Sequence, residues 1–382
     1  MPGEVTEIEA ELLADAERAA GLSDWGEDQS FRNGLKVYIE DMLELDEPQA
    51  GALRATLVHL LAQHLQLIED GKRNPGILAE DVGQPVVILG IPRGGTTYTH
   101  ALLALDPTAR APLVWEAAFP SPPPEAASFD SDPRIARLGA MMEDMLRARP
   151  ELKQIHDMKP LNESECEQFM EAHMTSNDLW ASFDVPRHAR WISAGASEGY
   201  YAAHRRMLQQ FQWHGPRGRW TLKSPDHLYR VPALLDAYPN ACIVQTHRDP
   251  AKTLPSQASL IYTMRCLVDP DCDRSKIGPE VIEVWRPAYA NAARNRHDPR
   301  LAARTLNVGY REVIDDPIGT VRRIHKHFDL PFSAVHEARI RAKIAQDKAE
   351  RTEPHRYTPE EFGIEPGMTD FPDYKEAFGD LF

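Results

Sequence analysis

The sequence predicts an α/β fold built on a doubly wound parallel sheet, and three observations support this prediction. Residues 86–90 form a short run of β-branched and aliphatic residues, typical of a buried strand, and a glycine-rich turn and a helix follow. Further apolar runs lie at 220–222, 241–246 and 305–308, and helical segments such as 227–237 separate them. Strands that alternate with helices indicate a doubly wound parallel sheet.

The N-terminal part of the chain predicts a helical extension. Apolar residues recur at helical spacing around Leu12 and again around Tyr38, and a third helical segment runs from about residue 49 to residue 69. We therefore expect a helical extension over residues 1–80 and an α/β domain over residues 81–382.

A helical insertion interrupts the alternation from about residue 119 to residue 215. It opens with a stiff, proline-rich stretch at 120–124 and continues as segments rich in methionine, tryptophan and phenylalanine. Ligands of open α/β sheets bind beyond the carboxyl ends of the strands. We expect the insertion to cover that edge of the sheet.

Composition and charge restrict the possible partners and compartment. The 382 residues carry a formal net charge of -15, which argues against a nucleic acid partner. No run approaches the roughly 20 apolar residues of a membrane span, and the first residues do not resemble an export signal. The four cysteines form no CxxC pair and have no histidines at zinc spacing. We expect a cytoplasmic protein with reduced thiols, no membrane span and no metal.

The turn after the first predicted strand is a candidate anion site. Residues 90–97 read Gly-Ile-Pro-Arg-Gly-Gly-Thr-Thr, which fits the P-loop pattern GxxxxGK[ST] except that Thr96 replaces the lysine. The glycines let backbone amides converge, and the next helix directs its free N–H groups and positive dipole end toward an anion. The missing positive charge reappears upstream as Arg93. The alternative is a tight turn that only lets strand and helix pack closely.

Two more basic residues stand at the ends of predicted strands. Arg248 leaves one strand, and Ser256 follows it eight residues later, so the two side chains can converge on one phosphate. Lys223 ends another strand and should face the ligand crevice. The alternatives are a surface ion pair of Arg248 with Asp249 and a helix-cap ion pair of Lys223 with Asp226.

Together these motifs resemble those of the PAPS-dependent sulfotransferases. Residues 92–97 are similar to the 5′-phosphosulfate loop of that family, with Gly94 in place of the usual serine. Lys223 resembles the lysine that contacts the transferring sulfuryl group in tyrosylprotein sulfotransferases. The resemblance implies that Arg248 and Ser256 hold the 3′-phosphate of PAPS. It also implies that the 5′ end is held by Arg93, Gly94, Gly95, Thr96 and Thr97.

The C-terminal part carries a further resemblance. His355, Arg356 and Tyr357 are similar to the segment that closes over the nucleotide in bacterial sulfotransferase-family proteins. The resemblance begins at about residue 84 and reaches the end of the chain, whereas the preceding helical extension has no counterpart.

Sulfuryl transfer to an alcohol needs a general base and cations near the leaving group. Arg93 and Lys223 are the predicted cations. Glu116 is the first candidate base, because tyrosylprotein sulfotransferases place their glutamate at nearly this distance from the loop arginine. Glu165 is the second candidate and Glu163 the third; both belong to an acidic cluster that could also be a solvated helix start.

The sequence therefore predicts a transferase that moves a sulfuryl group from PAPS to a hydroxyl of a small-molecule or lipid acceptor. The products are PAP and a sulfate ester, and no metal is required. A P-loop-type nucleotide kinase and a catalytically inactive nucleotide-binding module are the alternatives. Thr96 at the lysine position and the lack of an obvious Walker-B-like acid disfavour the kinase. The sequence leaves the acceptor and the oligomeric state open.

Overall fold

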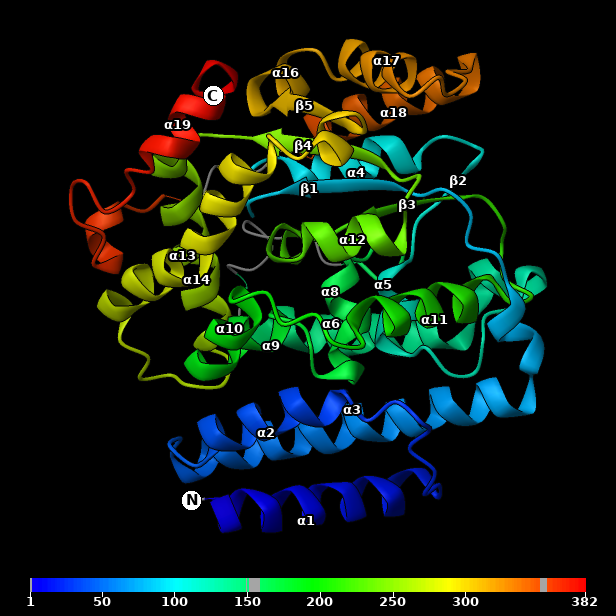
Figure 1. The fold of residues 1–382 in the computed structure, drawn as a ribbon, viewed down its shortest axis with the longest axis vertical. Coiled ribbons are helices and arrows are strands. Elements are labelled where there is room, and N and C mark those ends of the chain that lie inside the picture. The colour runs from blue at the N-terminus through cyan, green and yellow to red at the C-terminus, as the bar shows by residue number, and fades with distance from the viewer. Residues whose placement is uncertain (1, 149, 151–158, 351–355) are drawn as a thin grey trace.

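A parallel sheet forms the centre of the molecule (Figure 1). The computed structural model describes residues 2–148, 150, 159–350 and 356–382. All neighbouring strands of the five-stranded sheet are parallel, so the predicted α/β fold class is confirmed. In spatial order the strands are β2 (Ala109–Arg110), β3 (Arg219–Lys223), β1 (Val86–Gly90), β4 (Cys242–His247) and β5 (Thr305–Gly309).

Helices cover both faces of the sheet, with α17 and α18 on one side and α8, α11 and α12 on the other (Figure 1). Among the described helices, none is long and apolar enough to cross a membrane. The short 3-10 helices are η1 (Pro75–Ala79), η2 (Ala126–Ser131), η3 (Glu171–His173), η4 (Pro225–Tyr229), η5 (Pro359–Phe362) and η6 (Gly379–Leu381). The α-helices are α1 (Pro2–Ala20), α2 (Phe31–Met42), α3 (Glu47–Arg73), α4 (Thr96–Ala104), α5 (Val114–Ala118), α6 (Pro133–Ala148), α8 (Cys166–Met170), α9 (Asp178–Ser182), α10 (Pro186–Ser193), α11 (Tyr200–Gln212), α12 (Val231–Ala237), α13 (Pro250–Arg265), α14 (Arg274–Asn295), α15 (Pro299–Ala302), α16 (Tyr310–Asp315), α17 (Pro317–His327), α18 (Ala334–Ala349) and α19 (Pro372–Phe378).

The central strands are buried on both faces, and alternate side chains belong to two different cores. Val86 and Val244 pack with apolar residues of α4, α16, α17 and α18. Val87 and Ile243 point to the opposite face and join a larger core. That larger core continues through the helices between β2 and β3 to α1, α2 and α3. This two-sided burial explains why the strands are continuous apolar runs in the sequence.

The register of the sheet brings three strand ends to one edge. Ile88 of β1 pairs with Lys223, the last residue of β3. Two residues later, Gly90 ends β1 and pairs with Thr246 of β4. The glycine-rich loop, Lys223 and the turn that carries Arg248 therefore leave the sheet side by side.

Helices α1, α2 and α3 lie where the sequence predicts helices, as a layer at the end of the molecule opposite α17 (Figure 1). Hydrogen bonds join this layer to the helices that follow β2. The hydroxyl of Tyr38 donates to the carbonyl of Ser176 at 3.1 Å, and Asp41 accepts from the backbone N–H of His188 at 2.9 Å. Both Tyr38 and Asp41 are buried, so the N-terminal layer is anchored by polar contacts as well as by its apolar core.

The structure corrects two details of the predicted elements. The short edge strand β2 is not predicted, because two residues carry no readable periodicity. The predicted helix over 227–237 is split into η4 and α12. Pro232 has no N–H for the carbonyl of Leu228, and that carbonyl accepts instead from the side chain of Asn291 at 3.1 Å.

Candidate active site

The loop between β1 and α4 has the backbone geometry of an anion cradle. Gly90 has φ 155°, and a Cβ at this position would lie 2.3 Å from the hydroxyl oxygen of Thr246. Gly95 has φ 89° and is followed at once by α4. Arg93 adopts a positive φ of 66° without being glycine, a strained conformation that is typical of functional loops. The N-terminus of α4 thus opens toward the carboxyl edge of the sheet, where it can bind an anion.

The two predicted anion anchors lie in direct contact. Arg93 donates from Nε to Oγ of Ser256 on α13 at 3.1 Å. Arg248 donates from Nη1 to the backbone carbonyl of Arg93 at 2.7 Å. The sequence predicts a second cationic site away from the loop, whereas the structure joins that site to the loop arginine. Two guanidinium groups and one hydroxyl therefore occupy a single region.

Tyr310, at the start of α16, completes this region and is missed by the sequence prediction. Its ring lies under the guanidinium of Arg248, with 3.9 Å from Cζ to the ring centroid. A Cβ at position 95 would approach Cδ2 of Tyr310 to 3.0 Å, which adds a steric reason for Gly95. The signal in the sequence is its place directly after a predicted strand, at the edge where ligands bind.

Lys223 and Glu165 form a buried ion pair at the end of β3. The Lys223 side chain is 2% exposed and that of Glu165 is 21% exposed. Lys223 also donates to Oγ1 of Thr97 at 3.2 Å, which connects it to the first turn of α4. Glu165 caps the N-terminus of α8, so the inserted helices supply the partner of the strand lysine.

Buried acids surround this ion pair. Ser224 donates to Glu167 at 3.4 Å, and burial raises the pKa of Glu167. Burial also raises the pKa of Asp226 to about 6, and its carboxylate accepts from the backbone and side chain of Asn177. Asp226 therefore accepts hydrogen bonds from Asn177, and the observed carboxylate partner of Lys223 is Glu165.

Glu116, the first candidate base, lies in a different environment. One carboxylate oxygen accepts from Arg110, and the other accepts from the backbone N–H of Leu113 at 2.9 Å. The side chain is fully buried, and burial raises its pKa while Arg110 opposes the rise. Both oxygens have structural partners, so Glu116 is not brought together with Lys223. Glu163, the third candidate, forms a backbone bridge with Leu113.

Within the C-terminal segment, Tyr357 lies near the loop arginine Arg93. His355 lies outside the described residues, and Arg356 is exposed. Burial lowers the pKa of Arg93, and Tyr357 acts against that shift, which places Tyr357 within electrostatic range of the loop arginine. The ring of Tyr357 also contacts that of Phe362, with centroids 6.2 Å apart.

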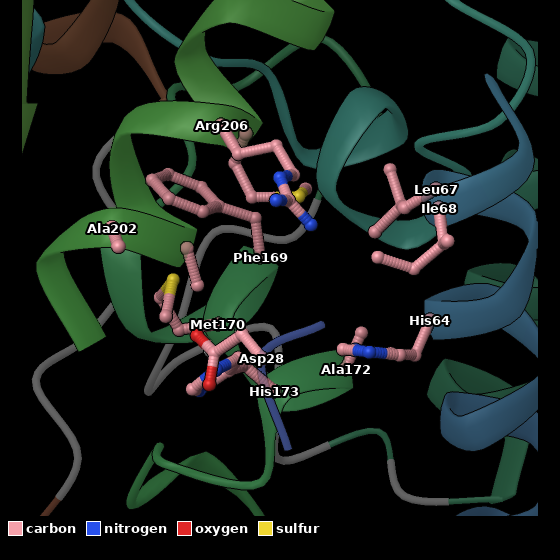
Figure 2. Close-up of a pocket in the computed structure, with 12 residues that line it drawn as sticks. Asp28, His64, Leu67, Ile68, Phe169, Met170, Ala172, His173, Ala202 and Arg206 are labelled. Atoms are coloured by element: carbon pink, nitrogen blue, oxygen red, sulfur yellow. Dashed lines mark ion pairs between the residues drawn. The ribbon is translucent and has the colours of Figure 1, made fainter. Parts of the chain in front are cut away.

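A pocket lies between the N-terminal layer and the helices that follow β2 (Figure 2). Leu67 and Ile68 of α3 face Phe169 and Met170 of α8 across it. Its cavity volume is only about 40 Å³. Asp28 and His173 lie at its lower end in Figure 2, with 4.0 Å between carboxylate and imidazole. The pocket is therefore apolar over much of its lining and adjoins α8, the helix that Glu165 caps.

Comparison with known proteins identifies the family. Residues 85–334 match the model of the sulfotransferase family. The chain belongs to that family. The resemblance seen in the loop and in the Arg248 region is therefore confirmed at the level of the family.

Two sulfotransferases are similar in sequence to part of this sulfotransferase-family chain. The omega-hydroxy-beta-dihydromenaquinone-9 sulfotransferase Stf3 of Mycobacterium tuberculosis is 28% identical over 148 residues, and the match spans 37% of this chain and 37% of that relative. Stf3 of Mycobacterium bovis matches to the same extent. These curated relatives are thus matched over little more than a third of their length.

Two crystal structures resemble the whole fold. Sulfotransferase STF1 from Mycobacterium tuberculosis H37Rv is 28% identical with a TM-score of 0.81, covering 97% of this chain and 98% of that one. Sulfotransferase STF9 from Mycobacterium avium is 26% identical with a TM-score of 0.84, covering 97% of this chain and 95% of that one. The similarity includes the N-terminal helical layer, which the sequence alone could not relate to a known family.

Proposed function

We propose that this chain transfers a sulfuryl group from PAPS to the hydroxyl of an apolar, lipid-like acceptor. One observation carries the proposal: Lys223 meets Thr97 at the start of α4, beside a loop whose Arg93 is joined to Arg248 and Ser256. This arrangement offers one cradle for a sulfuryl group and one cluster of cations for phosphate. Family membership supports the same activity.

The donor fits the contacts of the loop. The N–H of Gly94 already donates to the carbonyl of Ile91 at 3.0 Å. The amides of residues 95–97 and the dipole of α4 would hold the 5′-phosphosulfate, with Arg93 as the adjacent cation. Arg248 and Ser256 would hold the 3′-phosphate through charge-assisted hydrogen bonds. Arg93 is hydrogen-bonded to Ser256 through its side chain and to Arg248 through its backbone carbonyl. One connected set of residues would therefore contact both ends of the nucleotide.

The reaction is an in-line displacement at sulfur. The acceptor oxygen forms a bond to sulfur, and the bond from sulfur to the bridging oxygen of PAP breaks with its electron pair remaining on PAP. Lys223, which contacts Thr97 at the start of α4, would donate a hydrogen bond to that bridging oxygen as negative charge grows there. The proton of the acceptor hydroxyl passes to a carboxylate.

We propose Glu165 as that carboxylate, ahead of Glu116 and Glu163. It is the partner of Lys223, and its 21% exposure leaves it accessible to an acceptor. Glu116 is fully buried, and both of its oxygens are occupied by Arg110 and Leu113. The order predicted from the sequence is therefore changed in this proposal.

The acceptor proposal rests on the pocket beside α8. Glu165 caps this helix, and Phe169 and Met170 on the same helix line the pocket, about one helical turn further on. An acceptor with its hydroxyl at Glu165 would therefore direct its apolar part toward the pocket of Figure 2, and the side chains that line this pocket would have to move apart to admit it. The relatives named for an omega-hydroxy menaquinone substrate support a lipid alcohol as the acceptor class.

The compartment is part of the same proposal. Cys166, Cys242 and Cys266 are buried, and the proposal keeps the cytoplasmic location that the sequence predicts. A kinase is disfavoured because Thr96, at the position of the P-loop lysine, is buried and carries no charge.

The proposal is tested by supplying sulfur-labelled PAPS or phosphorus-labelled ATP with a panel of hydroxylated isoprenoids, sterols and fatty alcohols. We expect label from PAPS, and none from ATP, in an ester product with formation of PAP. Transfer only from ATP would refute sulfuryl transfer. Transfer from PAPS only to small polar alcohols would refute the lipid acceptor but would support sulfuryl transfer from PAPS.

A further inference from the structure

Cys166, His204 and His227 converge in the interior behind the Lys223–Glu165 ion pair. All three side chains have an exposed fraction of 0%. One possible ligand atom from each residue, the thiol sulfur and one ring nitrogen of each histidine, lies within 4.8 Å of the other two. They come from α8, α11 and η4, so their positions in the sequence give no hint of this cluster.

Each histidine of the cluster has one occupied and one unpartnered nitrogen. Nδ1 of His204 lies 2.7 Å from the hydroxyl of Tyr238, and Nδ1 of His227 lies 3.0 Å from the hydroxyl of Tyr201. Among the described residues, the buried Nε2 atoms of His204 and His227 have no hydrogen-bond partner. Buried polar atoms are almost always paired, and two such atoms beside a thiol require an explanation.

We propose that Cys166, His204 and His227 bind a zinc ion. Thiolate and imidazole ligands favour zinc over magnesium or calcium, which prefer oxygen. Zinc–nitrogen and zinc–sulfur bonds of about 2.0–2.3 Å place tetrahedral ligand atoms roughly 3.3–3.8 Å apart. The three ligand atoms, which lie within 4.8 Å of one another, would have to move closer together on binding. The sequence predicts no metal, because these three residues lie far apart in the chain and form no short, regular ligand spacing.

The contacts around the cluster are those of a supported metal site. A ligating histidine usually has its other ring nitrogen held by an oxygen, as Tyr238 and Tyr201 do here. Burial raises the pKa of the Cys166 thiol, and the backbone N–H of Lys223, which donates to its sulfur, opposes that rise. Coordination would use the two orphaned Nε2 atoms and place the ion directly behind Lys223.

A second cluster of the same kind provides a contrast. Asp106, His325 and His336 also have ligand atoms within 4.8 Å of one another. The Asp106 carboxylate already pairs with Arg219 at 3.0 Å, and His336 bonds through Nε2 to the carbonyl of Leu102 at 2.9 Å. The guanidinium of Arg219 thus already supplies a positive charge to this second cluster, which serves as the control site.

The ion would position the proposed catalytic pair without touching the substrate. Cys166 follows Glu165 directly, and its sulfur contacts the backbone of Lys223. His227 lies four residues after Lys223 and belongs to η4. Coordination would therefore join α8 to the end of β3, the two elements that present Glu165 and Lys223 to each other.

The test measures bound metal in the full chain produced in medium supplemented with zinc. We expect about one zinc per chain by elemental mass spectrometry after gel filtration. Cys166→Ser and His204→Gln should reduce the content at least tenfold, whereas the controls Cys242→Ser and His336→Gln should keep it. Wild type without stoichiometric metal, or variants of the cluster that retain it, would overturn the proposal.

Cobalt substitution detects a cysteine ligand in the wild-type chain itself, so this part of the test does not depend on how the variants fold. Wild-type chain grown with cobalt should show a thiolate-to-cobalt charge-transfer band in the near ultraviolet, which reports a cysteine ligand. We expect the band in wild type and in Cys242→Ser, and its loss in Cys166→Ser. Bound cobalt without that band, or a band lost in Cys242→Ser alone, would place the metal elsewhere and overturn the assignment.

Discussion

Lys223, at the end of β3, is ion-paired with Glu165, the cap of α8. Each charge is compensated by the other, which makes burial of the ammonium group tolerable. A sulfuryl group held by the loop would offer Lys223 a competing anion. Glu165 would then be released to accept the proton of an acceptor alcohol, so donor binding and base activation would be coupled through one lysine.

The first prediction concerns this lysine. Lys223→Ala should lower kcat by about 10²–10³, the range for loss of one charge-stabilising donor. The affinity for PAP, the product nucleotide, should change far less, because the loop and Arg248 remain. Initial rates and calorimetry with PAP check this, and the exposed Lys276→Ala is the matched control. A raised KM for PAPS with unchanged kcat would make Lys223 a binding residue only.

The second prediction separates Glu165 from Glu116. Glu165→Gln keeps the size of the side chain and removes its ability to accept a proton, so kcat should fall by about 10²–10⁴. Glu116→Gln should leave the kcat of the folded enzyme nearly unchanged. It should lower the free energy of unfolding instead, because breaking a buried ion pair costs about 3–5 kcal/mol. Urea unfolding and rates per folded molecule distinguish the two, and the reverse pattern would restore Glu116 as the base.

These two glutamates show where prediction from sequence ends. The strands and the glycine loop are readable because burial and tight turns impose local patterns, as in residues 86–97. The pairing of Glu165 with Lys223 joins positions 58 residues apart and leaves no local pattern. The distance in sequence between Glu116 and Arg93 suits a general base. The Glu116 carboxylate, however, accepts a hydrogen bond from Arg110, only six residues before it.

The same reason explains the other differences between prediction and structure. Tyr310 contacts Arg248 through the packing of β5 beside β4, and the sheet order is not contained in either segment alone. The contact of Arg93 with Ser256 likewise depends on how α13 leaves β4. The sequence therefore predicts the residues of the anchors, and the tertiary structure determines which of these residues contact one another.

The third prediction concerns pH and stability. Burial lowers the pKa of His247 to about 4, and its two ring nitrogens bond to Tyr374 and Asn307. In the unfolded chain the pKa is about 6.5, so the unfolded state binds the extra proton first as pH falls. The stability contributed by neutral His247 is complete above about pH 6.5 and decreases down to about pH 4.

The measurement compares wild type with His247→Gln by urea unfolding at several pH values. The advantage of wild type should shrink by about 1.4 kcal/mol per pH unit within that window. The exposed His327→Gln is the control for the substitution itself. A constant advantage for His247 as well would show that the buried imidazole titrates normally.

The fourth prediction concerns magnesium. The loop lacks the P-loop lysine, and the proposed donor contacts come from Arg93, Arg248 and Ser256, so turnover should need no added divalent ion. Rates measured after brief EDTA treatment should equal those with excess magnesium. An ion enclosed by Cys166, His204 and His227 should not exchange on that time scale, because all three are fully buried. Activity that depends on magnesium would favour the kinase alternative.

The last prediction tests the donor through its 3′-phosphate. Arg248 and Ser256 are assigned to that group, so PAPS should bind far better than APS, which lacks it. Charge-assisted hydrogen bonds contribute about 1.5–3 kcal/mol each, or roughly tenfold to a hundredfold in affinity. Arg248→Ala should weaken PAPS binding by at least that factor and should weaken APS binding less.

The contact of Arg248 with the carbonyl of Arg93 makes a complete cycle necessary. Loss of this contact loosens the loop and should penalise both nucleotides equally, whereas loss of the 3′-phosphate contact penalises PAPS alone. Measuring two proteins against two nucleotides by calorimetry cancels the shared loss and isolates the coupling between Arg248 and the phosphate. A coupling of at least tenfold supports the assignment. Equal losses for PAPS and APS would mean that Arg248 only supports the loop, and the 3′-phosphate would need another partner.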